Sequence, residues 1–216
     1  MSSVLSYIVE RLYVIPGILV GLSVHEYGHA KVAQMCGDTT GEYQGRVSLD
    51  PRAHIDPVGL IALLLVGFGW GRPVMIDPRQ FRYPRRDQIL VGLAGVFNNL
   101  ICAIVFAFVY RFALQLLPAS FLRSTFGGVV TGILLNVVVI NISLMLFNLL
   151  PIPPLDGFGV LCGIFNLYGT RFYWIARRYG MIVLIIMMYF GITGNILRPA
   201  LNAVLSIVFR IASVGL

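Results

Sequence analysis

Long hydrophobic runs separated by short polar connections dominate the pattern of the chain. The first run extends from Leu5 to about Ala33, and its part from Leu12 to Val24 has no charged residue. Further long apolar runs cover about 88–117, 126–150, 181–197 and 200–214, the last two forming one span each or a hairpin. A helix needs about 20 apolar residues to cross the hydrocarbon core of a bilayer. The pattern therefore predicts a multi-pass membrane protein.

The connections between the first two long runs follow another pattern. Residues 45–50 alternate between polar and apolar side chains, as a β-strand does, and residues 72–76 form a second predicted strand. Between them, the apolar run Val58 to Trp70 is too short for a straight span, which favours a re-entrant segment or a short membrane helix. The predicted fold is an all-α integral membrane bundle of about 4–6 membrane helices with short membrane-associated β-strands.

Composition agrees with this class. Hydrophobic residues make up 58% of the chain and charged residues only 12%, a balance that a soluble domain of this length would not tolerate. The length of 216 residues leaves no room for a separate soluble domain beside that many spans. We therefore expect a single polytopic domain over residues 1–216, with its core over about 5–165 and C-terminal helices over about 179–214.

The net charge of +7 comes from basic residues that are arginines, apart from Lys31. These arginines flank the apolar runs and do not form a patch suited to nucleic acid, so they indicate topology and contact with lipid headgroups. Because basic connections favour the cytoplasmic side, we expect residues 71–87 and 166–178 to face the cytoplasm. The connection 118–125 should lie on the opposite side, and the side of the N-terminus stays open.

Two further features of the sequence limit the possibilities. Cys36, Cys102 and Cys162 lie far apart and form no CxxC pair, so they are predicted to be small core residues and not disulfide or metal ligands. The N-terminus lacks the pattern of a cleaved signal peptide, so the first helix is expected to remain as a span.

The most informative polar motif is HEYGH, residues 25–29, at the end of the first apolar run. Residues four apart lie about one helical turn from each other, so His25 and His29 face the same way and offer two imidazole nitrogens to one zinc ion. Glu26 is placed to act as a general base on a water molecule. The alternative is a pair of core histidines with satisfied hydrogen bonds.

Asp156 is the residue expected to complete the ligand set. It is the only residue between Arg123 and Arg171 with a side chain that is normally charged at neutral pH, and the prolines in 151–154 break the helix just before it. A carboxylate at membrane depth needs a positive partner, and non-helical backbone there lines protein or a wet cavity. The alternatives are a turn aspartate at the membrane surface and a different ligand, His54, the only other histidine.

A catalytic zinc ion takes three protein ligands and keeps one position for water. His25, His29 and Asp156 would supply the ligands for one zinc ion per chain. Glu26 would accept a proton from water and pass it to the leaving amine, which is metalloprotease chemistry.

Asparagines provide candidates for holding the substrate. Asn148 is predicted to hold the substrate backbone or the oxyanion, and Asn99 is a weaker candidate for the same role. For both residues the alternative is an ordinary hydrogen bond between helices.

The motifs HEYGH at 25–29 and NLLPIPPLDG at 148–157 together resemble the paired signatures of the site-2 protease family of intramembrane zinc metalloproteases. Residues 45–59 and 69–78 resemble the connecting segments of its compact prokaryotic members, so the likeness covers most of 12–165. The resemblance implies that His25, His29 and Asp156 are zinc ligands, that Glu26 is the catalytic glutamate and that Asn148 lies near the active site.

The resemblance also implies cleavage of transmembrane protein substrates inside a lipid bilayer, here the cytoplasmic membrane of a prokaryote. One departure concerns Asn99, because this chain lacks the Ala-Gly-Pro that often precedes that asparagine in the family. A homo-oligomer or a separate regulatory partner is compatible with the sequence, and a nucleic-acid partner is not expected.

Two other functions compete with proteolysis. A channel or carrier would explain intramembrane histidines and an aspartate, but it does not explain why Glu26 adjoins His25, and the chain has no internal repeat. A zinc-bound but inactive scaffold that binds membrane helices is the second alternative, although the chain retains the base that such a protein would be expected to lose.

Overall fold

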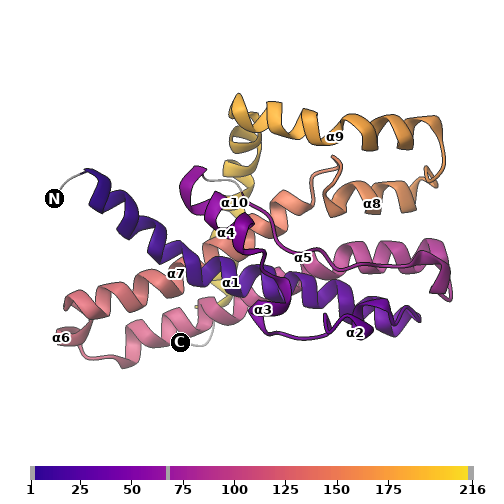
Figure 1. Cartoon of the computed structure of the whole chain (residues 1–216). Coiled ribbons are helices and arrows are strands. Elements are labelled where there is room, and N and C mark those ends of the chain that lie inside the picture. Colours follow the sequence, from indigo (N-terminus) through magenta and orange to yellow (C-terminus); the bar gives the residue numbers. More distant parts are fainter. Residues whose placement is uncertain (1–2, 67–68, 214–216) are drawn as a thin grey trace.

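The computed structural model of the protein describes residues 3–66 and 69–213. Its three longest helices are α1 (Ser3–Cys36), α5 (Pro84–Leu116) and α7 (Thr125–Asn148), which pack against one another and form the centre of the molecule (Figure 1). Helix α8 (Asp156–Ile164) packs on α5, and α10 (Ile192–Ile211) packs on α5 and α7 and follows α9 (Arg171–Tyr189). The short helices are α2 (Thr40–Tyr43), α3 (Pro51–His54), α4 (Pro57–Val66), η1 (Pro78–Gln80) and α6 (Ala119–Leu122).

Within the described residues, four helices are long and apolar enough to cross a membrane, namely α5, α7, α9 and α10. Helix α5 illustrates how small and large side chains are distributed on these helices. Its inward face is made of small or polar side chains, whereas large apolar side chains are exposed on the outside. The inward residues include Ala94, Gly95, Asn99, Ala103 and Ala107, and the exposed ones Phe97, Ile101, Val105 and Val109. Small residues at helix contacts and apolar residues outside are typical of membrane bundles.

Helix ends and core packing follow from local sequence. Helix α5 begins at Pro84, which needs no hydrogen-bond acceptor at that position, and the carboxylate of Asp87 reaches back to accept the N–H of Tyr83 at 2.9 Å. The main apolar core joins α5, α7 and α10, with Ala103, Ile142 and Val208 almost fully buried in it.

The three cysteines are free and buried, as predicted.

The two predicted strands are wrong, since neither 45–50 nor 72–76 is a β-strand in the described structure. Alternation of polar and apolar residues makes a strand only where another strand can pair with it, and here side chains take that place. The N–H of Val74 bonds to the carboxylate of Glu26, and the N–H of Asp77 bonds to the carboxylate of Asp38. The fold is therefore all-α with irregular connections. The one β-bridge described joins Ile55 to Gly71.

That bridge shows the path of the chain on either side of the short apolar run Val58 to Trp70. The N–H of Arg72 also donates to the carbonyl of His54 at 2.7 Å, so the chain after the run returns to where it entered. Helix α4, with 10 residues, is too short to cross a bilayer. Within the described residues, this segment therefore returns to its starting point and contains no helix long enough to span a bilayer.

The C-terminal apolar region divides at a different place from the predicted one. The sequence runs 181–197 and 200–214 placed the break near Arg198-Pro199, but Pro199 lies inside α10. The chain turns at Gly191 instead, which has a φ of +69°, a conformation that favours glycine. Helices α9 and α10 are thus two segments joined by a tight turn.

Candidate metal centre

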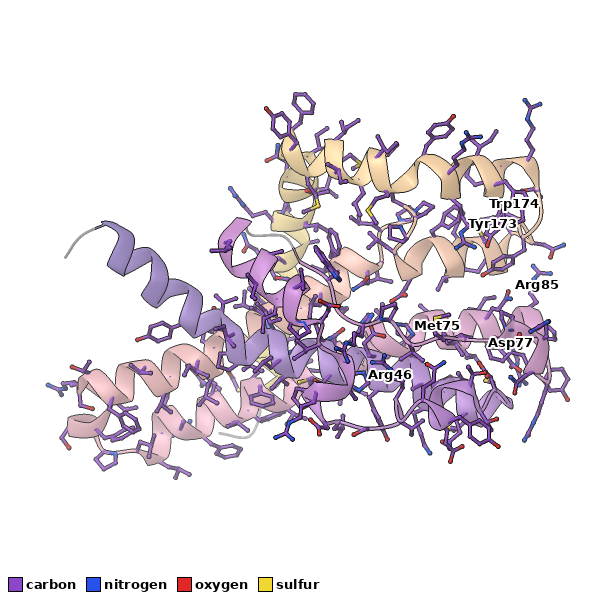
Figure 2. The ribbon with its side chains drawn as sticks, in the orientation of Figure 1. Arg46, Met75, Asp77, Arg85, Tyr173 and Trp174 are labelled. Carbon is purple, nitrogen blue, oxygen red and sulfur yellow. The ribbon has the colours of Figure 1, made fainter. Side chains whose placement is uncertain are left out.

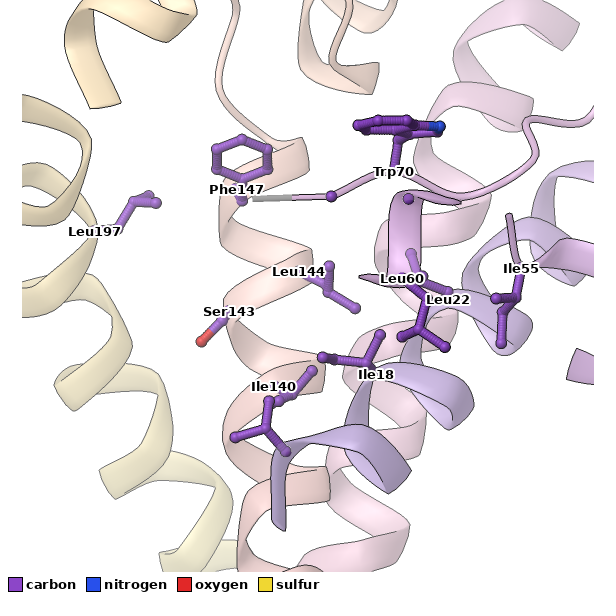
Figure 3. A pocket seen from close by; sticks show the side chains of 13 residues that line it. Ile18, Leu22, Ile55, Leu60, Trp70, Ile140, Ser143, Leu144, Phe147 and Leu197 are labelled. Atoms are coloured by element: carbon purple, nitrogen blue, oxygen red, sulfur yellow. The ribbon is translucent and has the colours of Figure 1, made fainter. Parts of the chain in front are cut away.

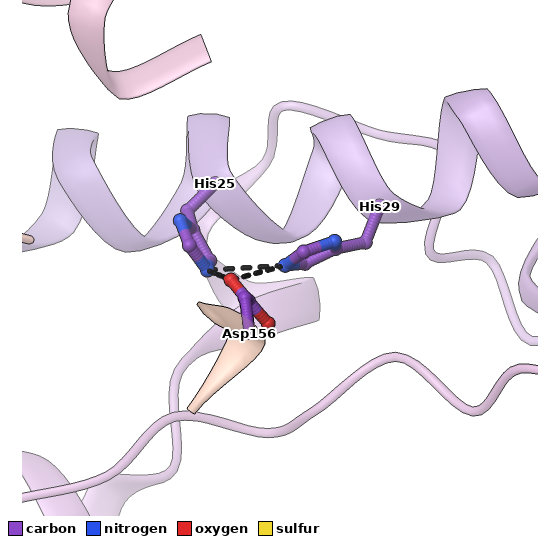
Figure 4. Close-up of side chains that lie close together, drawn as sticks. All are labelled: His25, His29 and Asp156. Atoms are coloured by element: carbon purple, nitrogen blue, oxygen red, sulfur yellow. Dashed lines mark hydrogen bonds and ion pairs between the residues drawn. The ribbon is translucent and has the colours of Figure 1, made fainter. Parts of the chain in front are cut away.

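Three side chains predicted as metal ligands meet between α1 and α8 (Figure 4). The Nε2 atoms of His25 and His29 are 3.1 Å apart, and Oδ2 of Asp156 lies 3.1 Å from the first and 3.2 Å from the second. Both histidines are buried and Asp156 is largely so. The ligand atoms all lie within 4.8 Å of one another. Two residues one helical turn apart and a third about 130 residues away along the chain have therefore been brought to one point.

Local sequence explains how Asp156 reaches the histidines. Helix α7 ends at Asn148, the proline-rich stretch breaks the helical path, and Asp156 is the first residue of α8. Gly157 allows the tight turn there, because a Cβ atom on it would lie 2.3 Å from the carbonyl oxygen of Leu149. Helix α8 is carried on α5, which also packs along α1.

Hydrogen-bond partners define the protonation of both imidazoles. Nδ1 of His25 lies 2.7 Å from Oδ1 of Asn99, and Nδ1 of His29 lies 2.7 Å from the carbonyl oxygen of Val91. Both partners are acceptors only, so each Nδ1 must carry the hydrogen and each neutral imidazole presents a lone pair at Nε2. Second partners of this kind are usual for histidines that bind metal.

The resulting centre fits a cation. Two Nε2 lone pairs and Oδ2 of Asp156, a buried oxygen without a hydrogen-bond partner, converge with no hydrogen between them. Tetrahedral zinc with ligands at about 2.0–2.1 Å separates ligand atoms by about 3.3 Å, close to the spacing described here. The residues present therefore fit zinc.

Close packing of α5 leaves room for the imidazoles only because residue 95 is glycine. A Cβ atom on Gly95 would lie 2.6 Å from Cε1 of His25 and 2.7 Å from Nε2 of His29. Gly28, between the two histidines, is crowded in the same way, since its Cβ atom would lie 2.9 Å from the carbonyl oxygen of Ala94. The contact between α1 and α5 is thus shaped around the metal centre.

Glu26 is held beside the centre by the irregular connection that follows α4. Its Oε2 atom accepts a hydrogen bond from the backbone N–H of Val74 at 3.0 Å, and the side chain is half-buried. Figure 2 shows Met75 and Asp77 along this same connection. A carboxylate fixed by a backbone donor and next to the ligands is suited to act as a base.

The other candidate residues have different surroundings. Asn99, the weaker candidate from sequence, contacts His25 directly and is fully buried. Asn148 lies outside the ligand cluster, and its amide donates to the carbonyl of Leu144 in its own helix at 3.0 Å. His54 is also outside the cluster, with Nε2 2.7 Å from the carbonyl oxygen of Ser48. The structure therefore does not bring His54 to the metal centre.

An apolar cavity of about 440 Å³ lies between α1, α4 and α7 (Figure 3). Leu22 of α1, Leu60 of α4 and Phe147 of α7 line it, together with Trp70. Ser143 contributes a hydroxyl to an otherwise mostly apolar lining. Glu26 follows Leu22 by four residues on α1, one turn further along nearly the same face. The cavity thus borders α1 about one helical turn before the candidate base.

Comparison with known proteins gives relatives along most of the chain. "Putative zinc metalloprotease YwhC" from Bacillus subtilis is 35% identical over 194 residues, which cover 88% of this chain and 86% of that protein. "Putative zinc metalloprotease Rip2" from Mycolicibacterium smegmatis is 30% identical, over 92% of this chain and 71% of that protein. Its namesake from Mycobacterium tuberculosis is 32% identical, over 73% and 59% respectively. No family model matches the chain, and no solved structure gives a significant match.

Proposed function

Because the chain belongs to the site-2 protease family of zinc metalloproteases, we propose that it is an intramembrane zinc endopeptidase. It hydrolyses peptide bonds within or near transmembrane segments of other membrane proteins. The observation that carries this proposal is the convergence of two imidazole nitrogens and one carboxylate oxygen next to a second carboxylate, that of Glu26. A purely structural metal site is closed by a fourth protein ligand, whereas three ligands and a base are typical of a catalytic one.

Each side chain has a defined role in this reaction. His25, His29 and Asp156 hold the metal, and zinc, when bound, supplies Lewis acidity that lowers the pKa of water and polarises a carbonyl group. Glu26 accepts the proton that water loses and then donates it to the amine that leaves, so that one carboxylate serves both halves of hydrolysis. The hydrogen bond from Val74 orients the carboxylate for the first of these steps.

Asn148 is proposed to act on the substrate and not on the metal. It is half-buried at the last turn of α7, close in sequence to the break that delivers Asp156. One hydrogen of its amide is used within the helix, which leaves the amide oxygen and the second hydrogen for a peptide group. We assign it to hold the substrate backbone or the oxyanion.

The surroundings of the centre support an apolar substrate. Four helices with the length and composition of spans, and a largely apolar cavity lined by α1, α4 and α7, match a transmembrane segment better than a soluble peptide. The location that follows is the cytoplasmic membrane of a prokaryote, with the chain crossing it several times. The protein would thus act in regulated intramembrane proteolysis.

Mapping the cleaved bond tests this function. The full chain, reconstituted in liposomes with a single-span membrane protein, should cut that substrate within or near its apolar segment, and mass spectrometry of the products gives the bond. Glu26→Gln in the same liposomes is the control for contaminating proteases. Cleavage confined to soluble loops, or equal in the control, would contradict the proposal.

A further inference from the structure

A chain of buried amide groups runs from α7 through α5 to the first histidine. Asn141 on α7 and Asn99 on α5 are both completely inaccessible to solvent. Nδ2 of Asn141 donates to the carbonyl of Val137 at 2.8 Å, and Nδ2 of Asn99 donates to Oδ1 of Asn141 at 2.9 Å. Oδ1 of Asn99 is 2.7 Å from Nδ1 of His25. Three helices are thus connected by side-chain hydrogen bonds at one level of the bundle.

The orientation of these two amide groups is fixed at Asn141, the residue farther from His25. A backbone carbonyl can only accept, so the amide of Asn141 must turn its nitrogen toward Val137 and its oxygen toward Asn99. Asn99 must then present its nitrogen to Asn141 and its oxygen to His25. The carbonyl of Gly21 on α1, 2.9 Å from Nδ2 of Asn99, favours the same orientation.

The orientation matters because the two ends of an amide have nearly the same shape. An Asn99 turned the other way would present hydrogens to Nδ1 of His25, which would then have to accept and would carry its proton at Nε2. A protonated Nε2 has no lone pair for a metal. The direction of the amide therefore decides whether His25 can be a ligand.

We propose that Asn141 is a positioning residue for the metal centre, acting through Asn99 to keep Nε2 of His25 free for the metal. This inference rests on the proposed role of His25 as a ligand. The helices are closely packed here, since a Cβ atom on Gly21 of α1 would lie 2.7 Å from Cδ1 of Leu144 on α7 and 3.6 Å, an ordinary contact distance, from the Asn141 amide.

The test is metal affinity, measured by chelator competition with zinc and with cobalt on the full chain in detergent. Asn141→Leu removes the acceptor for Asn99 and should lower affinity about 10-fold to 100-fold, the usual cost of losing a partner behind a metal-binding histidine. The visible absorption of the cobalt form should change as well. Asn136→Leu is the matched control, because Asn136 is on the same helix and also donates to a carbonyl four residues earlier, that of Gly132.

The same substitution made in an Asn99→Asp variant shows whether Asn141 acts by orienting Asn99 or only by packing between helices. In Asn99→Asp, either oxygen of the carboxylate can accept from His25, so its orientation no longer matters. Adding Asn141→Leu there should cost little further affinity, whereas an effect through packing would cost the same in both backgrounds. If Asn141→Leu does not fold, Asn141→Ser replaces it, since Ser143 shows that a serine on this helix bonds to its own backbone, here the carbonyl of Val139.

The outcomes are distinct. Loss of affinity in Asn141→Leu that disappears in the Asn99→Asp background supports the proposal. Equal affinities for Asn141→Leu and Asn136→Leu, or an equal cost in both backgrounds, would overturn it while leaving the proposed function intact. A wild-type chain that binds neither zinc nor cobalt would overturn the metal centre and this inference with it.

Discussion

The backbone N–H of Val74 donates a hydrogen bond to Oε2 of Glu26 at 3.0 Å. The connection predicted to form a strand thus serves to fix the candidate base beside the histidines. A carboxylate with one oxygen held by a backbone donor has fewer orientations to lose when it takes a proton from water, which is an advantage for general base catalysis.

Replacing that donor should slow the reaction without removing the metal. Val74→Pro has no backbone N–H, and we expect kcat to fall by about 10-fold to 100-fold, part of the 10²–10⁴ that a positioned base contributes. Turnover and bound zinc are measured on the same preparation. Met75→Pro is the control, because the described structure gives the N–H of Met75 no acceptor. Equal losses in the two variants would show that the connection, and not this hydrogen bond, matters.

The close approach of Gly95 to both imidazoles allows a steric test of the metal centre. In Gly95→Ala the new methyl group would lie within 2.7 Å of both imidazoles, which cannot move without leaving the metal. Zinc affinity should fall by about 100-fold or more, at the upper end of the effects of disturbed ligands. Alanine favours a helix over glycine by about 1 kcal/mol, so the fold itself should not be weakened by propensity.

The matched control for that variant is Gly128→Ala on α7, where an added Cβ atom has no neighbour within 4 Å. Isothermal titration of metal-free protein with zinc compares the two. Normal zinc binding by Gly95→Ala would mean that the histidines are not where the described packing puts them.

The apolar cavity should limit which substrates are cut. Ser143→Trp would fill part of the space beside Phe147, and we expect slower cleavage of a substrate with bulky apolar residues near the scissile bond, with zinc content unchanged. A substrate with alanines at those positions should be affected less. Cleavage rates for both substrates in wild type and variant measure this, and equal slowing of the two would argue against the cavity as a substrate site.

The sequence was sufficient to select three side chains that meet in the structure, because HEYGH and the isolated Asp156 can each be recognised from a short stretch of sequence. HEYGH has helical spacing, and Asp156 is isolated among uncharged residues, so each could be judged without knowing the fold. The role of Asn99 could not be predicted, since it depends on the rotation at which α5 packs on α1. Gly95 has the same limitation, because only the packed helices show what its missing side chain would touch.

Irregular regions were predicted less well for a related reason. Alternation over 72–76 indicates a strand only if a partner strand exists, and the hydrogen bonds of Val74 and Asp77 go to carboxylates far along the chain. The predicted break between the two C-terminal helices was too late in the sequence, because a proline such as Pro199 is a stronger sign of a helix end than a glycine such as Gly191. Proline is tolerated inside a membrane helix when neighbouring groups compensate.

The positions of the polar connections give a prediction for membrane topology. Arg85, at the start of α5, donates to the carbonyl of Gly163 at the end of α8 at 2.8 Å, and Figure 2 shows it at the same end of the molecule as Tyr173 and Trp174. Helix α6 lies at the other end of α5 and α7 (Figure 1). Single cysteines at positions 79 and 123, in a chain without its own cysteines, should be labelled from opposite sides. Labelling from one side would contradict the assignment.

Zinc content measured beside turnover in two variants tests the central claim most directly. Wild type and Glu26→Gln should each contain a single zinc ion per chain, and Glu26→Gln should have no activity because the ligands remain and the base is lost. Asp156→Ala should lose both zinc and activity, since only His25 and His29 would remain as ligands. An Asp156→Ala variant with full zinc and full turnover, or a Glu26→Gln variant that cleaves normally, would contradict the account.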